Sequence, residues 1–235
     1  MGQVLLVRHA QASFGSADYD RLSELGIEQA RLLGASLASR GRRIDFAVTG
    51  SLKRHRQTAE ACLAMLPAAL QPAEASRAEA DFNEYDADEV IARHRPEFAD
   101  PALLQRHLEA SGNPRRAFQD LFALAMGRWM EGNRDDEYRE SWTAFCHRCV
   151  AAVHRLIERA GPSRTSLVFT SGGPIAAIGK HLLELPDRRA FDLNLALVNS
   201  AVTGLLYQRG RISLSYLNNF AHLEQTGNAQ VITYR

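Results

Sequence analysis

Residues 4–10 read VLLVRHA, so that four apolar side chains lead directly into Arg8 and His9. A short unbroken apolar run is typical of a strand buried on both faces of a parallel sheet. Ligands of open parallel sheets bind beyond the carboxyl ends of the strands, which is where Arg8 and His9 would lie. The Arg8 guanidinium suits phosphate, and a neutral His9 ring can act as a nucleophile. The dipeptide alone is a weak motif, and a surface pair after a core strand explains it equally well.

The composition is that of an ordinary globular chain. Of 235 residues, 46% are hydrophobic and 23% are charged, and the formal net charge is +1. This balance gives no overall field that would favour nucleic acid or an anionic membrane. No apolar run approaches the roughly 20 residues that span a bilayer, and the first residues lack the features of a secretory signal. We therefore expect a cytoplasmic protein without nucleic-acid or membrane partners.

The three cysteines are an odd number, which argues against a disulfide framework and for a reducing compartment. Cys146 and Cys149 have the spacing of redox and metal sites, but Cys149 belongs to an apolar stripe at helical spacing. No second ligand pair follows at zinc spacing. We interpret Cys149 as a core residue and expect neither a metal nor another cofactor.

The next elements predict an α/β fold. A helix capped by Ser23 follows the first strand and leads to a second one, which favours a right-handed βαβ unit with a parallel strand pair. Helical patterns broken by proline and glycine fill residues 86–140, and we interpret them as a helical insertion over the sheet edge within one domain, residues 1–235. Two later strands alternate around Arg209-Gly210 and predict an antiparallel edge hairpin. The strands after the first are expected at residues 44–48, 166–170, 202–207 and 212–217.

Groups suited to an anion follow two of these strands. Thr49 or Ser51 could cap a helix whose first turn contains Arg54, and a helix start with its free N–H groups favours anions. Ser171 and Gly172 stand at a strand-to-helix turn, where glycine lets backbone N–H groups approach an anion. The plainer interpretations are a solvated basic helix end and a tight turn. A cation at a helix start is unfavourable unless an anion visits, which favours a phosphate site.

These groups can perform phosphoryl transfer. Arg8 and Arg54 would neutralise a phosphomonoester, which carries close to two negative charges, with Ser171 and Gly172 as further donors. His9 would attack phosphorus and become a phosphohistidine. Glu84, in an acidic loop, would protonate the departing alkoxide and then activate water.

The motifs, in this order, resemble the histidine phosphatase superfamily, in the branch related to phosphoglycerate mutase, over nearly the whole chain. The resemblance implies a three-layer α/β/α fold with a mostly parallel sheet, an antiparallel edge hairpin and a helical insertion. It also implies a metal-independent phosphohydrolase acting on a small phosphomonoester. The matching segments are LVRHA at 6–10 with alanine in place of the signature glycine, GSLKRHRQTAE at 50–60, FNEYD at 82–86 and LNNFAHL at 217–223.

One departure from the family concerns Ser171, which stands where a second histidine normally precedes the Gly-Gly turn. A hydroxyl can donate to a phosphoryl oxygen but brings no charge, and one lost donor can cost about 10²–10³ in rate. His55 or His222 could compensate for it. Together with Gln11, these two residues are our candidates for contacting the substrate or supporting the site.

Three other functions compete with the phosphatase. A phosphoglycerate mutase is one, although Tyr85 stands where such mutases carry an arginine after the acid. A weakly active or inactive phosphate-binding regulatory protein is another, motivated by Ser171. A serine hydrolase is disfavoured because Phe169 occupies the glycine position of the nucleophile elbow. Specificity should lie in the insertion, where Arg115 and Arg116 are more simply solvated than substrate-binding. The edge hairpin is a candidate homodimer surface.

Overall fold

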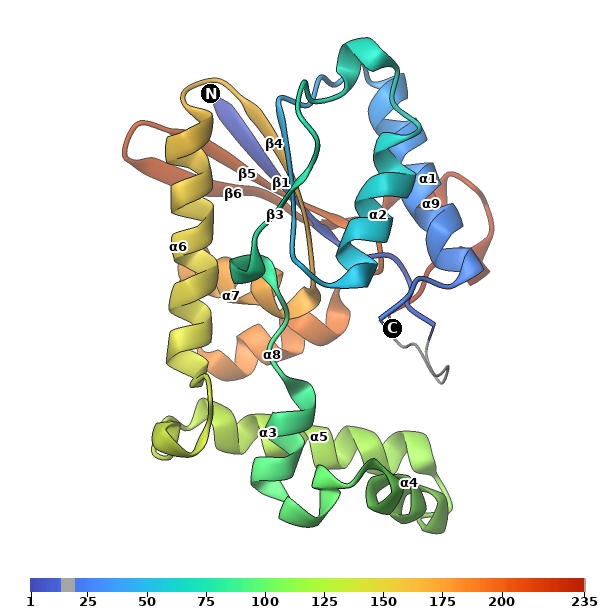
Figure 1. Ribbon diagram of the computed structural model, residues 1–235, viewed down its shortest axis with the longest axis vertical. Coiled ribbons are helices and arrows are strands. Elements are labelled where there is room, and N and C mark those ends of the chain that lie inside the picture. Colours follow the sequence, from blue (N-terminus) through green and yellow to red (C-terminus); the bar gives the residue numbers. More distant parts are fainter. Residues whose placement is uncertain (14–19, 235) are drawn as a thin grey trace.

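The computed structural model describes residues 1–13 and 20–234. Within them, one mixed sheet has the strand order β3-β2-β4-β1-β5-β6 (Figure 1). Strands β1 to β4 are parallel, whereas β5 and β6 form an antiparallel hairpin at one edge. This confirms the predicted fold class. The strands are β1 (Gly2–Arg8), β2 (Phe46–Thr49), β3 (Arg77–Ala78), β4 (Thr165–Thr170), β5 (Val202–Gln208) and β6 (Arg211–Asn219).

Helices cover both faces of the sheet. Figure 1 shows α1, α2 and α9 on one side and α6 and α7 on the other, with α8 packed against α7. The helices are α1 (Glu24–Ser39), α2 (Lys53–Leu63), α3 (Ala87–His94), α4 (Pro101–Ala110), α5 (Pro114–Met130), α6 (Trp142–Ala160), α7 (Gly172–Leu183), α8 (Asp187–Ala196) and α9 (Ala221–Glu224). None of them is long and apolar enough to span a bilayer, as far as the described residues go.

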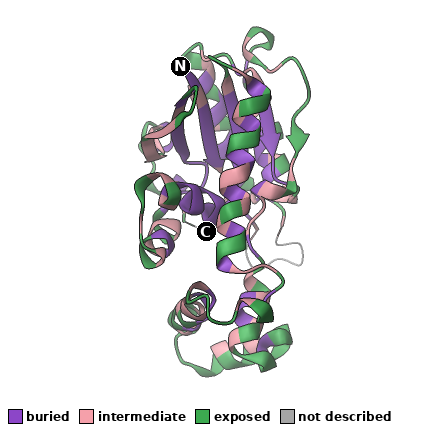
Figure 2. Cartoon of the chain, turned by 90° about the vertical axis from the view of Figure 1, so that its left-hand side faces the viewer, coloured by how far each residue is buried: buried purple, intermediate pink, exposed green. Residues whose placement is uncertain are grey.

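Strand β1 is buried on both faces, as its apolar run predicts. Val4 and Leu6 pack in the core that includes α6 and α7, whereas Leu5 and Val7 pack with α1 and α2. This alternation follows from the two-residue period of a strand. Figure 2 shows the strands mostly in purple, because helices cover both faces of the sheet, whereas the helices carry more exposed residues in green.

The predicted pairing of the first two strands is wrong. β1 and β2 are parallel but do not touch, because β4 lies between them and bonds to both. The side chains of Leu167, Val168 and Phe169 in β4 are fully buried. A strand that is apolar on both faces gains most from a central position, so β4 takes the place beside β1.

Helices α3 to α5 extend below the carboxyl edge of the sheet as the predicted insertion (Figure 1). Much of their surface is exposed (Figure 2). Their buried side chains, including Leu121, Met126 and Trp129 of α5, join the core on the α6 side of the sheet. The insertion therefore shares its core with the sheet while leaving an exposed outer surface.

Helix starts were predicted correctly in one case and incorrectly in another. The hydroxyl of Ser23 accepts a hydrogen bond from Gly26 N, as expected for the cap of α1. Neither Thr49 nor Ser51 caps α2, whose N-cap position is Leu52. The carboxylate of Asp20 takes this role across the chain, accepting a hydrogen bond from Lys53 N at 2.7 Å. The strand β3 and the helix α8 were not predicted from the sequence.

Candidate active site

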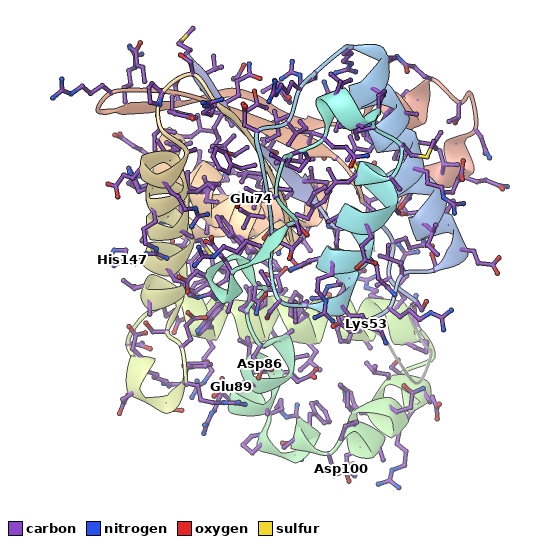
Figure 3. All side chains as sticks on the ribbon, turned by 45° about the horizontal axis from the view of Figure 1, so that its top comes forward. Lys53, Glu74, Asp86, Glu89, Asp100 and His147 are labelled. Carbon is purple, nitrogen blue, oxygen red and sulfur yellow. The ribbon has the colours of Figure 1, made fainter. Side chains whose placement is uncertain are left out.

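The carboxyl ends of β1, β2 and β4 lie together because their registers align. His9 N donates to Thr170 O at 2.7 Å, and Gly50 N donates to Phe169 O at 2.9 Å. This edge carries His9, the start of α2 and the start of α7; we call residues 8–10, 49–55, 83–85 and 170–173 the rim. Figure 3 labels Lys53, at the start of α2 in the rim, and Asp86, which directly precedes α3 of the insertion.

His9 is held in the form that a nucleophile needs. Its side chain is only 7% exposed, and Nδ1 donates to the carbonyl oxygen of Ala10 at 2.8 Å. A carbonyl only accepts, so Nδ1 carries the proton and Nε2 keeps its lone pair when the ring is neutral. Burial, with Arg54 and Arg8 nearby, lowers the pKa of His9 well below its usual range. The ring is therefore neutral at physiological pH.

The charges of the two predicted phosphate-binding arginines both lower the pKa of His9. Each guanidinium group is held by hydrogen bonds to other parts of the chain. Arg54 Nη1 donates to Asp20 Oδ1 at 2.7 Å, and the arginine side chain is 12% exposed. The helix start that the sequence offers to an anion thus already has a carboxylate beside it. Arg8 donates from Nη1 to Leu197 O and from Nη2 to Tyr234 O, the latter at 2.9 Å. These bonds fix the direction of both guanidinium groups.

Glu84 reaches the rim from the segment before the insertion. Its Oε2 accepts a hydrogen bond from Gly173 N at 3.1 Å, and Oε1 accepts one from Tyr85 N at 3.3 Å. A Cβ on residue 173 would lie 2.0 Å from Oε1, so this approach requires glycine. Burial raises the pKa of Glu84, and the two N–H donors and Arg54 oppose it less strongly. A carboxyl group with a raised pKa is suited to donate a proton.

Ser171 and His55 form a buried pair in the rim. Both residues are fully buried, and His55 Nε2 is hydrogen-bonded to Ser171 Oγ at 2.7 Å. The centre of the His55 ring lies 5.7 Å from that of His9. Gly172 is buried beside them at the start of α7. The structure thus brings Ser171 and Gly172 to the predicted edge, with the serine hydroxyl facing His55.

Gln11 and His222 make hydrogen bonds to segments that adjoin the rim. Gln11 Oε1 accepts a hydrogen bond from Ser23 Oγ at 2.8 Å and so belongs to the cap of α1. His222 Nε2 is hydrogen-bonded to Ser200 Oγ at 2.9 Å, and Ser200 N donates to Arg8 O at 3.1 Å. Burial lowers the pKa of His222 to about 4. His222 therefore supports the backbone of Arg8 through Ser200.

Several other residues bear on the predictions. Asp20 and Asn199 were missed: Asn199 Nδ2 donates to His9 O at 3.1 Å, and no local pattern marks either residue.

Arg115 and Arg116 are exposed, and Arg116 Nε lies 3.8 Å from Asp120 Oδ2. Cys149 is fully buried in the core, as its helical spacing predicted. Among residues 1–13 and 20–234, no cluster of three His, Cys, Asp or Glu side chains is arranged to hold a metal.

The family model of the histidine phosphatase superfamily, branch 1, matches residues 4–220. The chain belongs to this superfamily. The match includes the whole rim, so His9, Arg8, Arg54 and Glu84 all lie within the family region. A sequence search of curated proteins found no significant match.

Solved structures of phosphatases and mutases share the fold of this histidine phosphatase superfamily member. A phosphoserine phosphatase mutant from Entamoeba histolytica in complex with phosphoserine is 14% identical, with a TM-score of 0.63, over 95% of this chain and 100% of that one. Phosphoglycerate mutase from Bacillus anthracis is 17% identical, with a TM-score of 0.63, over 96% of each chain. A mycobacterial glucosyl-3-phosphoglycerate phosphatase with inorganic phosphate is 21% identical, with a TM-score of 0.59, over 94% and 98%. At these identities the likeness establishes the fold.

Proposed function

We propose that this protein is a metal-independent phosphohydrolase that cleaves small phosphomonoesters through a phosphohistidine on His9. The observation that carries the proposal is the state of the His9 ring. Nδ1 donates its proton to the Ala10 carbonyl, and burial keeps the ring neutral, so Nε2 holds a lone pair, with Arg54 and Arg8 close enough to lower the pKa of the ring. The proposed substrate class is a small phosphorylated metabolite, and no nucleic-acid or membrane partner is required.

In the first half of the proposed reaction, the Nε2 lone pair bonds to phosphorus while the bond to the ester oxygen breaks. Arg8 and Arg54 neutralise the charge on the equatorial phosphoryl oxygens. Protonated Glu84 gives its proton to the ester oxygen, which leaves as an alcohol. The raised pKa of Glu84 supports this assignment, because an ordinary carboxyl group would have lost its proton near neutral pH.

In the second half, a water oxygen bonds to phosphorus. The Glu84 carboxylate takes a proton from that water, and the phosphorus–nitrogen bond breaks with its electron pair returning to Nε2. Inorganic phosphate leaves, and His9 and protonated Glu84 are regenerated. One carboxyl group thus serves as acid and then as base.

Mutase activity is the second candidate, because a phosphoglycerate mutase shares the fold. Such a reaction must hold a carboxylate-bearing substrate while its phosphoryl group is exchanged. Tyr85, which follows the acid, is only 8% exposed, and its ring centre lies 5.0 Å from that of Trp129. This position therefore offers the substrate no cation, which favours hydrolysis. Measuring conversion of 3-phosphoglycerate separates the two activities.

The decisive experiment uses the full chain with an aryl phosphate and a panel of phosphorylated metabolites, followed by trapping of the phosphoenzyme from radiolabelled substrate. We expect turnover and an acid-labile, alkali-stable label that is lost in His9→Ala. The matched control is His147→Ala, because His147 lies on the outer side of α6 (Figure 3) and should keep the label. A label retained in His9→Ala contradicts the proposal. Phosphate binding without turnover would instead support a regulatory role.

A further inference from the structure

We infer that His55 is a positioning residue of this active site and that it supplies, from helix α2, the imidazole that the family places at position 171. The inference rests on the proposed phosphoryl transfer through His9. It assigns a function to the pairing of His55 with Ser171 and explains how the chain can lack a histidine at the end of β4.

The first argument is that the His55 ring lies against position 171. His55 Nε2 and Ser171 Oγ are 2.7 Å apart, although the residues are 116 positions apart in the sequence. Both are fully buried, so the ring fills the volume directly beyond the serine hydroxyl. A histidine at 171 would need this same volume for its own ring. A buried imidazole could therefore fill this volume from either position, as a histidine at residue 55 or as one at residue 171.

The second argument is the contact with the nucleophile. The His55 and His9 ring centres are 5.7 Å apart and the ring planes are inclined by 35°. His9 itself has one described hydrogen bond from its ring, at Nδ1, so neighbouring side chains must limit its rotation. Removing a packed ring leaves a cavity beside His9, into which His9 can turn. The attacking nitrogen would then lose its alignment with phosphorus, on which transfer depends.

The third argument is that the surroundings are shaped to admit this ring. A Cβ on residue 50 would lie 2.1 Å from His55 Nδ1, so only glycine leaves room there. Burial and Arg54 lower the pKa of His55 well below its usual range, so the ring is neutral. A neutral ring does not neutralise charge on the phosphoryl group, so that task stays with Arg8 and Arg54. His55 thus acts through position and packing rather than through charge.

The test moves the imidazole between the two positions. The variants are His55→Ala, Ser171→Ala and the double exchange His55→Ala with Ser171→His, with exposed His147→Ala as the control. Each is checked for folding by its melting temperature. The rate of phosphoenzyme formation from an aryl phosphate is measured in a single turnover. Nitrogen NMR of the His9 ring reports its tautomer without any need for activity.

We expect His55→Ala to slow phosphoenzyme formation about 10²-fold and to mix the two His9 tautomers. Ser171→Ala, which removes only the hydrogen bond, should slow it less than about tenfold. The double exchange should recover at least about tenfold of the loss and restore the tautomer with the proton on Nδ1. A KM that changes less than the rate constant would agree with positioning, because the His55 ring is assigned a packing contact with His9 and no contact with substrate.

Two results would overturn the inference: a His55→Ala enzyme as fast as the wild type, or a folded double exchange no faster than His55→Ala. A variant that does not fold is replaced by Gly50→Ala, which displaces the ring without deleting it and should mix the tautomers in the same way. Failure of the proposed function looks different, because the wild-type protein would then form no phosphoenzyme. The NMR comparison would still decide whether His55 holds His9.

Discussion

In the rim, the Arg54 side chain is 12% exposed and lies 2.7 Å from Asp20; in the insertion, Arg116 is 78% exposed and lies 3.8 Å from Asp120. The difference extends beyond one pair. Arg8, Arg54 and Glu84 of the rim are each held by partners from distant parts of the chain. Arg116, by contrast, pairs within its own helix turn. A reaction that depends on fixed charges belongs in the first setting. Residues on the exposed surface of the insertion can be substituted at little cost in stability, which suits a surface that selects substrates.

The largest expected effect is in the rim. Arg54→Ala removes a fixed cation beside His9 and leaves the partly buried Asp20 carboxylate without it, so we expect kcat/KM for an aryl phosphate to fall about 10³-fold. Arg56→Ala is the matched control, because Arg56 is exposed two positions further along the same helix. It should keep activity within about twofold. If kcat/KM of Arg54→Ala fell less than tenfold, a fixed arginine would matter little more to the reaction than an exposed one, and the comparison would fail.

The next effect concerns the support behind the rim. His222 has a pKa of about 4 in the folded protein, against about 6.5 when unfolded. As pH falls from 6.5 to 4, the unfolded chain binds a proton that the folded one does not, so the free energy of unfolding should drop by about 3 kcal/mol through this residue.

The variant His222→Asn is neutral in both states and should lose that part of the pH dependence. Denaturant unfolding between pH 4 and 7 measures it, with exposed His154→Asn as the control. An unchanged slope in His222→Asn would mean that His222 is not held neutral by burial.

A smaller effect is expected at the acid. Glu84→Gln should slow phosphoenzyme formation in a single turnover about 10²-fold for an alkyl phosphate, whose leaving oxygen needs a proton, and much less for an aryl phosphate with a good leaving group. With the alkyl phosphate, the wild-type rate of phosphoenzyme formation should fall as pH rises through the raised pKa of Glu84, because only the protonated form donates. The variant should lack this alkaline decline. Exposed Glu74→Gln should behave as wild type, and equal losses on both substrates would reject Glu84 as the acid.

The smallest effect is expected in the insertion. Arg116→Ala removes an exposed pair within one helix turn, which is worth at most about 0.5 kcal/mol. Thermal unfolding should show a shift of no more than a few degrees, and activity on an aryl phosphate should not change. A large loss of activity would show that the insertion also holds fixed charges, and it would sharpen the question of which substrate group Arg116 meets.

Local patterns predicted most of the fold. The run before Arg8 predicts a strand buried on two faces, and the Ser23 cap and the edge hairpin follow from patterns within a few residues. The position of β4 between β1 and β2 does not, because strand pairing depends on contacts between distant segments. Asp20 caps α2 from 33 positions away, and no spacing rule anticipates such a cap.

The candidate site was predicted to a similar extent. The strand ends predicted the location of Arg8, His9 and Arg54, because carboxyl ends of parallel strands share one edge. Glu84 was a candidate because it lies in an acidic loop, and the resemblance to a family assigned the acid to the same residue. The sequence named His55 only as a possible substitute, and its pairing with Ser171 depends on how α2 lies over β4. That placement is a property of packing, which the sequence alone does not display.

The close approach of Gly173 to Glu84 indicates how a substrate-trapping variant of this protein could be made. The Gly173 backbone comes so close to Glu84 that a side-chain carbon there would need the space of a carboxylate oxygen. One added methyl group, as in Gly173→Ala, would therefore displace the Glu84 carboxyl group and uncouple proton delivery from phosphorus attack, while Arg8, Arg54 and His9 are left unchanged. Such a protein should still accept a phosphoryl group from an activated ester yet fail with an unactivated one, which would make it a tool for capturing natural substrates before they are cleaved.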